Sequence, residues 1–125
     1  MTNLDLECAK FGRKLAEIKA HGKLVEEKLF TSALAVLEEQ GPYACFLYLE
    51  AREGNAGREI TEKATSFLAR ILQEDKDSKD PLRFLQELAA DLDQLLFASE
   101  LLRQAFVYAR YHAKTKEESR GGEEA

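Results

Sequence analysis

The segment from Leu4 to Leu29 reads LDLECAKFGRKLAEIKAHGKLVEEKL and carries the most regular hydrophobic pattern of the chain. Its apolar residues recur at alternating steps of four and three residues, the spacing of one face of an α-helix. The members of this seam are Leu4, Cys8, Phe11, Leu15, Ile18, Gly22, Val25 and Leu29. The pattern predicts one continuous helical seam, with a bend or break at His21-Gly22 because glycine weakens a helix by about 1 kcal/mol relative to alanine.

The middle of the chain predicts a second helix that is more apolar than the first. Gly41-Pro42 is typical of a helix end followed directly by a helix start. Residues 43–49 are apolar on nearly every side of a helical wheel, so we expect this helix to be enclosed by others at the centre of the core. A loop is expected at 53–58, because Gly54-Asn55-Ala56-Gly57 is a cluster of flexible and polar residues.

The second half of the chain predicts three more helical stretches. Residues 59–74 have the pattern of an ordinary surface helix, and 74–80 form a charged linker. Asp80-Pro81 then supplies an N-cap followed by proline at the first helical position. An interruption is expected within 90–93, before a last helix over about 95–115. That helix should bury Phe97, Leu101, Leu102, Ala105, Tyr108, Ala109 and His112.

Length and composition indicate a single folded domain. The chain has 125 residues, of which 45% are hydrophobic and 33% are charged, a balance that is too apolar for a disordered chain and suits amphipathic helices. We therefore expect a compact all-α bundle of five or six helices over residues 1–116, with a flexible C-terminal tail over 117–125. The sequence has no apolar run long enough to span a bilayer and its N-terminus has no signal-peptide pattern, so a cytoplasmic location is expected.

Residues that could support catalysis are scattered. Cys8 and Cys45 fall on apolar helix faces and are interpreted as reduced core residues. These cysteines, with His21 and His112, lack the close pairing of zinc sites. Because the sequence also has no nucleophile elbow and no glycine-rich phosphate loop, it predicts neither an enzyme nor a cofactor.

Basic residues form one strip on the last predicted helix. The net charge of −5 argues against a free-standing nucleic-acid binder, so any RNA contact must come from a local patch. Arg103, Arg110 and Lys114 are spaced by seven and four residues and share one stripe of the helix. This stripe is either a solvated face that pairs with glutamates or a phosphate contact beside Tyr111.

A second basic group, Lys10, Arg13 and Lys14, lies near the start of the first helix. These residues spread around the helical wheel, so they predict a phosphate contact less strongly than the strip does.

Two stretches resemble the small subunit of type III-B CRISPR effector complexes, the Cmr module. In the first, from Lys19 to Arg52, a helix leads to a glycine and then to a short, very apolar helix that ends in a basic residue. The second, from Leu101 to Lys114, resembles the closing helix of that family. The chain departs from the family in having Gly41-Pro42 where glycine followed by leucine is usual.

The resemblance implies a non-catalytic helical subunit. Such a subunit stacks with copies of itself along the backbone filament and helps to hold guide RNA and target RNA. Its basic side chains would contact phosphates, which gives Arg52 and both basic groups an expected role. Two alternatives stay open: the small subunit of the related type III-A complex, and a helical adaptor that binds protein through the Leu4–Leu29 seam without contacting RNA.

Overall fold

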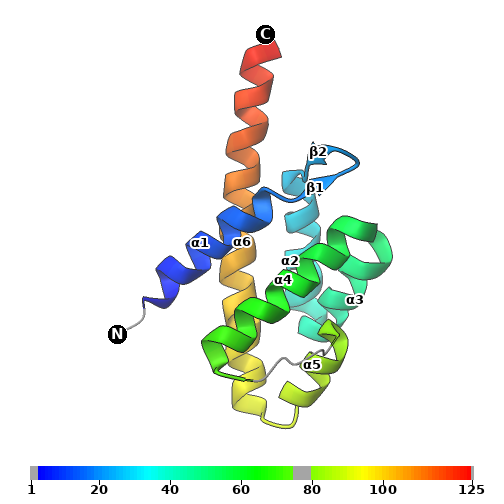
Figure 1. Cartoon of the computed structure of the whole chain (residues 1–125), viewed down its shortest axis with the longest axis vertical. Helices are drawn as coiled ribbons and strands as arrows, with labels where there is room; N and C mark the ends of the chain where they lie inside the picture. The colour runs from blue at the N-terminus through cyan, green and yellow to red at the C-terminus, as the bar shows by residue number, and fades with distance from the viewer. Residues whose placement is uncertain (1–2, 75–79, 125) are drawn as a thin grey trace.

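The computed structural model describes residues 3–74 and 80–124, with side chains up to residue 118. In these residues the all-α prediction is confirmed: six helices surround one core, and the only strands form a short hairpin (Figure 1). The elements are α1 (Leu4–Ala16), β1 (Lys19–Ala20), β2 (Lys23–Leu24), α2 (Glu27–Gln40), α3 (Pro42–Arg52), α4 (Gly54–Leu72), α5 (Pro81–Leu88) and α6 (Leu92–Glu124).

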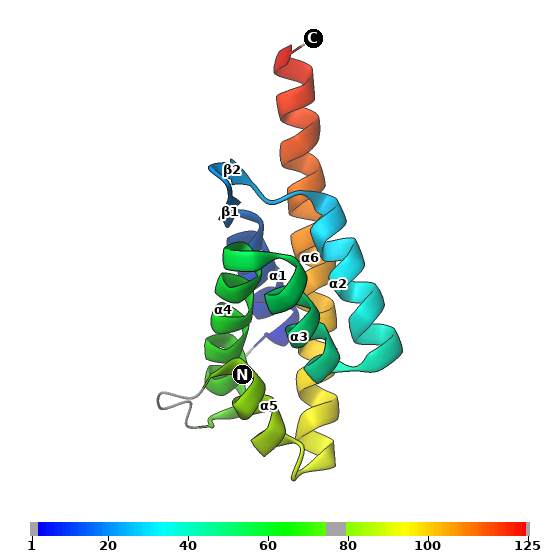
Figure 2. The same ribbon diagram turned by 90° about the vertical axis from the view of Figure 1, so that its right-hand side faces the viewer.

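The long helix α6 is the axis of the molecule. It packs chiefly against α1 on one side and α2 on the other, while α3 lies between α2 and α4 (Figures 1 and 2). The face of α6 that meets these helices is apolar, and its buried residues include Leu102, Ala105, Phe106 and Ala109. The ring centroid of Phe106 lies 6.3 Å from that of Phe30 on α2. The C-terminal end of α6 projects beyond the other helices (Figure 1).

A β-hairpin interrupts the Leu4–Leu29 seam at His21-Gly22, which confirms the expected break there, but the seam is not one continuous helix. Helix α1 ends at Ala16, and β1 pairs antiparallel with β2. His21 and Gly22 have φ angles of 54° and 79°, as a two-residue hairpin turn of matching twist requires. Ile18 and Val25 are nonetheless buried, because they lie at the two ends of the hairpin. The seam therefore marks core residues correctly without being one helix.

The start of α4 also differs from the expected loop at 53–58. Gly54–Arg58 form the first turns of α4, which pack closely on α3. A Cβ atom at Gly57 would lie 1.9 Å from the carbonyl oxygen of Leu49. Glycine at this position serves a close approach of two helices and does not end one. Gly12 has the same role between α1 and α6, since its Cβ would lie 2.7 Å from the carbonyl oxygen of Ala105.

Helix α3 is only partly enclosed, contrary to its all-round apolar sequence. Its inner side chains Cys45, Phe46 and Leu49 are buried, as expected. Tyr43 and Leu47 remain exposed at 41% and 49%, because α2, α4 and α5 leave the outer side of α3 uncovered.

Local capping signals locate the later helices correctly. The carboxylate of Asp80 accepts hydrogen bonds from the backbone N–H groups of Leu82 and Arg83, with Pro81 at the first helical position. Asp91 caps α6 in the same way, which confirms the interruption before the last helix. The backbone of α6 continues to Glu124, past the expected end near Thr115. Most of the expected linker lies outside the described residues, at 75–79.

Burial on α6 follows the prediction with some exceptions. Leu101, Leu102, Ala105 and Ala109 are buried as expected. Tyr108 and His112 are half-buried, and Phe97 is exposed at 38%.

Both cysteines are free and buried, as the sequence predicts. Burial raises the pKa of Cys8 to about 11 and the pKa of Cys45 to about 12. At pH 8 a thiol of pKa 11 is about 0.1% thiolate, the form that reacts. We expect neither thiol of the native protein to react with Ellman's reagent within minutes at pH 8, and both to react in guanidinium chloride. Rapid modification of the native chain would contradict this burial.

Candidate nucleic-acid interface

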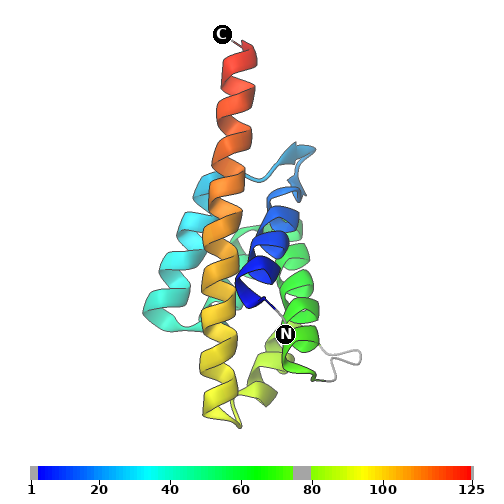
Figure 3. The same ribbon diagram turned by 90° about the vertical axis from the view of Figure 1, so that its left-hand side faces the viewer.

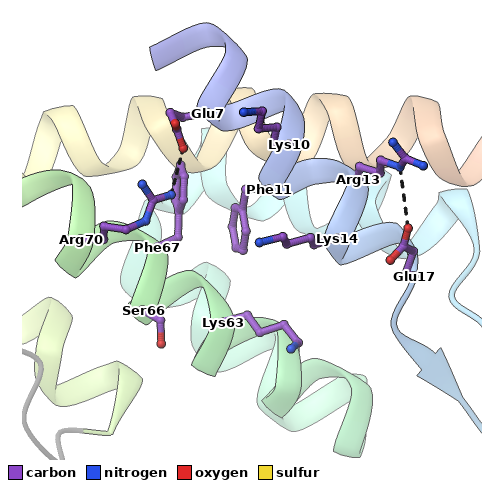
Figure 4. Close-up of a pocket in the computed structure, with 10 residues that line it drawn as sticks. All are labelled: Glu7, Lys10, Phe11, Arg13, Lys14, Glu17, Lys63, Ser66, Phe67 and Arg70. Atoms are coloured by element: carbon purple, nitrogen blue, oxygen red, sulfur yellow. Dashed lines mark hydrogen bonds and ion pairs between the residues drawn. The ribbon is translucent and has the colours of Figure 1, made fainter. Parts of the chain in front are cut away.

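Helices α1 and α4 enclose a groove with a volume of about 740 Å³ (Figure 4). Five basic and two acidic side chains line it, which leaves a surplus of three positive charges in a chain whose net charge is −5. The charged lining consists of Lys10, Arg13, Lys14, Lys63, Arg70, Glu7 and Glu17. A concave surface with one sign of charge concentrates its field, so this groove is the part of the structure best suited to a polyanion.

A stacked pair of phenylalanines joins the two walls of the groove. Phe11 of α1 and Phe67 of α4 lie nearly parallel, with an interplanar angle of 8° and ring centroids 4.4 Å apart. Both side chains are buried. The guanidinium of Arg70 lies 5.6 Å from the ring centroid of Phe67 and donates a 3.0 Å hydrogen bond to Glu7. The stacked phenylalanines therefore fix the distance between the two walls and between the cations on those walls.

The five cations differ in how far they are neutralised. Arg13 lies 3.8 Å from Glu17, Lys63 lies 3.7 Å from Glu59, and Arg70 pairs with Glu7. The side chains of Arg13, Lys63 and Arg70 are well exposed, whereas Glu7 is only 25% exposed. Exposed pairs contribute little energy and exchange readily. Lys10 and Lys14 make no ion pair within the described residues. Lys14 points into the groove between the walls in Figure 4. The two lysines are the cations most available to a ligand.

The structure brings the weaker of the two expected basic groups together. Lys10, Arg13 and Lys14 all line the groove, although they spread over the helical wheel of α1. Sequence reasoning missed Lys63 and Arg70, which it placed on an ordinary solvent face of α4. Their spacing around Phe67, four residues before it and three after, is the signal that could have drawn attention to this face.

The stronger expected group is separate from the groove. Arg103, Arg110 and Lys114 share one stripe of α6 by their helical spacing, and α6 runs between α1 and α2 (Figure 3). Arg103 pairs with Glu100, a hydrogen bond that lowers the pKa of the glutamate and raises that of the arginine. The guanidinium of Arg110 lies 5.3 Å from the ring centroid of Tyr111. None of the three residues lines the groove.

Arg52, the remaining expected contact, is an exposed residue in the last turn of α3 and also lies outside the groove. Among the described residues there is no cluster of three or more histidine, cysteine, aspartate or glutamate side chains that could hold a metal ion. None of the described helices has the length and apolarity that crossing a membrane requires.

Comparison with known proteins leaves the chain without a match: no family model fits it, and no curated protein or solved structure is significantly similar to it.

Proposed function

We propose that this chain is a non-catalytic small subunit of a type III-B CRISPR ribonucleoprotein complex in the cytoplasm, stacked with copies of itself along the backbone filament. The α1–α4 groove, defined by its charged lining, contacts the phosphates of guide or target RNA there. The observation that carries the proposal is the convergence of five cations on a rigid apolar floor in an acidic protein. Phosphate contacts hold RNA without reading its sequence, as an auxiliary subunit requires.

The weak neutralisation of the groove supports this use. Lys10 and Lys14 have no partner to release, and exposed pairs such as Arg13 with Glu17 separate at little cost when a phosphate approaches. Each phosphate contact also releases condensed counterions, which favours binding at low salt. The rest of the surface carries the negative balance of the chain, so it repels RNA and directs it towards the groove.

A rival function, an adaptor that binds protein through the Leu4–Leu29 seam, has little apolar surface available, because Leu4 is the one exposed apolar side chain of that seam. Cys8, Phe11, Leu15, Ile18 and Val25 of that seam are all buried in the core of this chain. A partner could reach them only after unfolding the bundle.

Co-purification tests the proposal. The chain is co-expressed with the other type III-B subunits and a guide RNA, and the complex is isolated through a tag on the backbone subunit. We expect this chain to elute with the complex, and we expect a Lys10→Glu, Lys14→Glu variant to elute with it as well. The complex with the variant should bind target RNA more weakly. Absence of the wild-type chain from an otherwise intact complex would reject the proposal.

A further inference from the structure

The outer side of α6 combines exposed leucines with the basic strip. Leu92 and Leu96 are exposed at 64% and 58%, among the largest values for apolar residues of the described chain. Arg103, Arg110 and Lys114 follow Leu96 at steps of seven, seven and four residues, so they lie on the same side of the helix as the two leucines. We call this set of five residues the α6 stripe: Leu92, Leu96, Arg103, Arg110 and Lys114. It is apolar at its N-terminal end and basic at its C-terminal end.

The stripe is long and lies on a single helix. From Leu92 to Lys114 it spans about 33 Å, at 1.5 Å per helical residue. Helices α1 and α2 flank the middle part of α6, and both ends of α6 extend past them (Figure 3). Contacts spaced by four and seven residues along a helix fit the side chains of a second helix lying against it.

The leucines argue against RNA as the ligand of this stripe. Phosphates are held by cations, and exposed leucines contribute nothing to that contact. Arg103 is already engaged by Glu100, and Glu38 of α2 further stabilises its charge. This leaves Arg110 and Lys114 as cations without an ion pair in the described part of the chain, both at the end of the stripe away from the leucines.

Charge also argues against a second copy that pairs through the same stripe. In an antiparallel pair centred on Arg103, the two Arg103 side chains would face each other, and Leu96 would face Arg110. In a parallel pair, Arg110 and Lys114 would each face their own copy. Like charges placed opposite each other in an interface disfavour it.

We infer that the α6 stripe is a docking site for a helix of another protein, one that presents leucine-like side chains to Leu92 and Leu96 and carboxylates to Arg110 and Lys114. Charge complementarity sets the direction of that helix, since only one orientation places its carboxylates at the basic end. This surface is distinct from the α1–α4 groove, so the chain can hold RNA and a protein at the same time.

Designed peptides provide the test, which does not depend on the proposed function. Two amphipathic helical peptides of about 22 residues carry leucines and glutamates at opposite ends of one face. The peptide with its leucines at the N-terminal end matches the stripe as a parallel helix. The peptide with its leucines at the C-terminal end matches the stripe as an antiparallel helix. Matched peptides have lysine for glutamate. By fluorescence anisotropy, one glutamate peptide should bind the full-length protein at least tenfold more tightly than its lysine counterpart.

Variants of the protein identify the surface. We expect Leu92→Glu, Leu96→Glu to weaken binding at least tenfold, and Arg110→Glu, Lys114→Glu to reverse the preference towards the lysine peptide. The groove variant Lys10→Glu, Lys14→Glu has the same charge change and should leave peptide binding within about threefold. Circular dichroism verifies that each variant is folded.

Three results would overturn the inference. The first is no preference of the wild-type protein for either glutamate peptide. The second is loss of RNA binding, rather than of peptide binding, in Arg110→Glu, Lys114→Glu. The third is a wild-type dimer in sedimentation that Leu92→Glu, Leu96→Glu dissociates. Because purified protein and peptides suffice, a failure here is distinguishable from absence of the chain from a CRISPR complex.

Discussion

Replacing Gly57 by alanine should destabilise the protein by about 3 kcal/mol, against the ordinary preference of helices for alanine. Within a helix, glycine to alanine normally stabilises by about 1 kcal/mol. At Gly57 the new methyl group would lie 1.9 Å from the carbonyl oxygen of Leu49. That atom belongs to the backbone of α3 and cannot rotate away, so α3 and α4 must separate and the core between them must open. Urea unfolding followed by circular dichroism measures the loss.

Gly22→Ala is the matched control for this substitution. Gly22 has a φ of +79° in the hairpin turn, and a Cβ there would meet nothing within 4 Å. Its replacement costs only the strain of a positive φ, about 1 kcal/mol. If Gly57→Ala is no more destabilising than Gly22→Ala, the close packing of α3 on α4 is incorrect.

Reversing two charges in the α1–α4 groove should have the largest effect on RNA binding. Lys10→Glu, Lys14→Glu turns the surplus of three positive charges into an excess of one negative charge. The isolated wild-type chain should bind single-stranded RNA weakly and with strong salt dependence, because its net charge is −5. In the variant we expect affinity at about 150 mM salt to fall at least tenfold. Loss of two phosphate contacts should also flatten the slope of log affinity against log salt by about 1.4.

A control variant with the same charge change distinguishes the effect of the groove on RNA affinity from the effect of net charge. Lys23 and Lys28 are exposed and lie outside the groove. At about 150 mM salt, where charges are screened beyond about 8 Å, Lys23→Glu, Lys28→Glu should alter RNA affinity less than threefold. Equal losses in both variants would mean that RNA responds to the net charge of the chain and not to the groove.

The features that the sequence predicts well depend on residues that are close together along the chain. Asp80-Pro81 located the start of α5 because an N-cap and the following proline act within one turn of helix. The sequence predicts the break at His21-Gly22 but not the hairpin, because Ile18 and Val25 are buried whether the chain between them is helical or extended. Gly54 and Gly57 suggested a loop because glycine is a local breaker, whereas the structure uses Gly57 for a contact between α3 and α4. That contact is not encoded in a local pattern.

The groove was only half predictable for the same reason. Lys10 and Lys14 were identified on α1, but the sequence does not specify that α4 lies opposite them. Lys63 and Arg70 come some fifty residues later, on a helix with an ordinary amphipathic pattern. The stacking of Phe11 on Phe67 brings the two sets together, and this pairing exists only in the folded chain. The strip on α6 was fully visible in the sequence because one helix carries all of it.

Cross-linking of RNA within the assembled complex tests the central claim most directly. The type III-B complex is assembled with this chain, a guide RNA and a target RNA, irradiated with ultraviolet light, and digested for mass spectrometry. We expect RNA adducts on peptides of this chain that contain Lys10, Lys14 or Lys63, and we expect their loss in the Lys10→Glu, Lys14→Glu variant. Adducts confined to the α6 stripe, or an assembled complex in which this chain carries no RNA adduct, would contradict it.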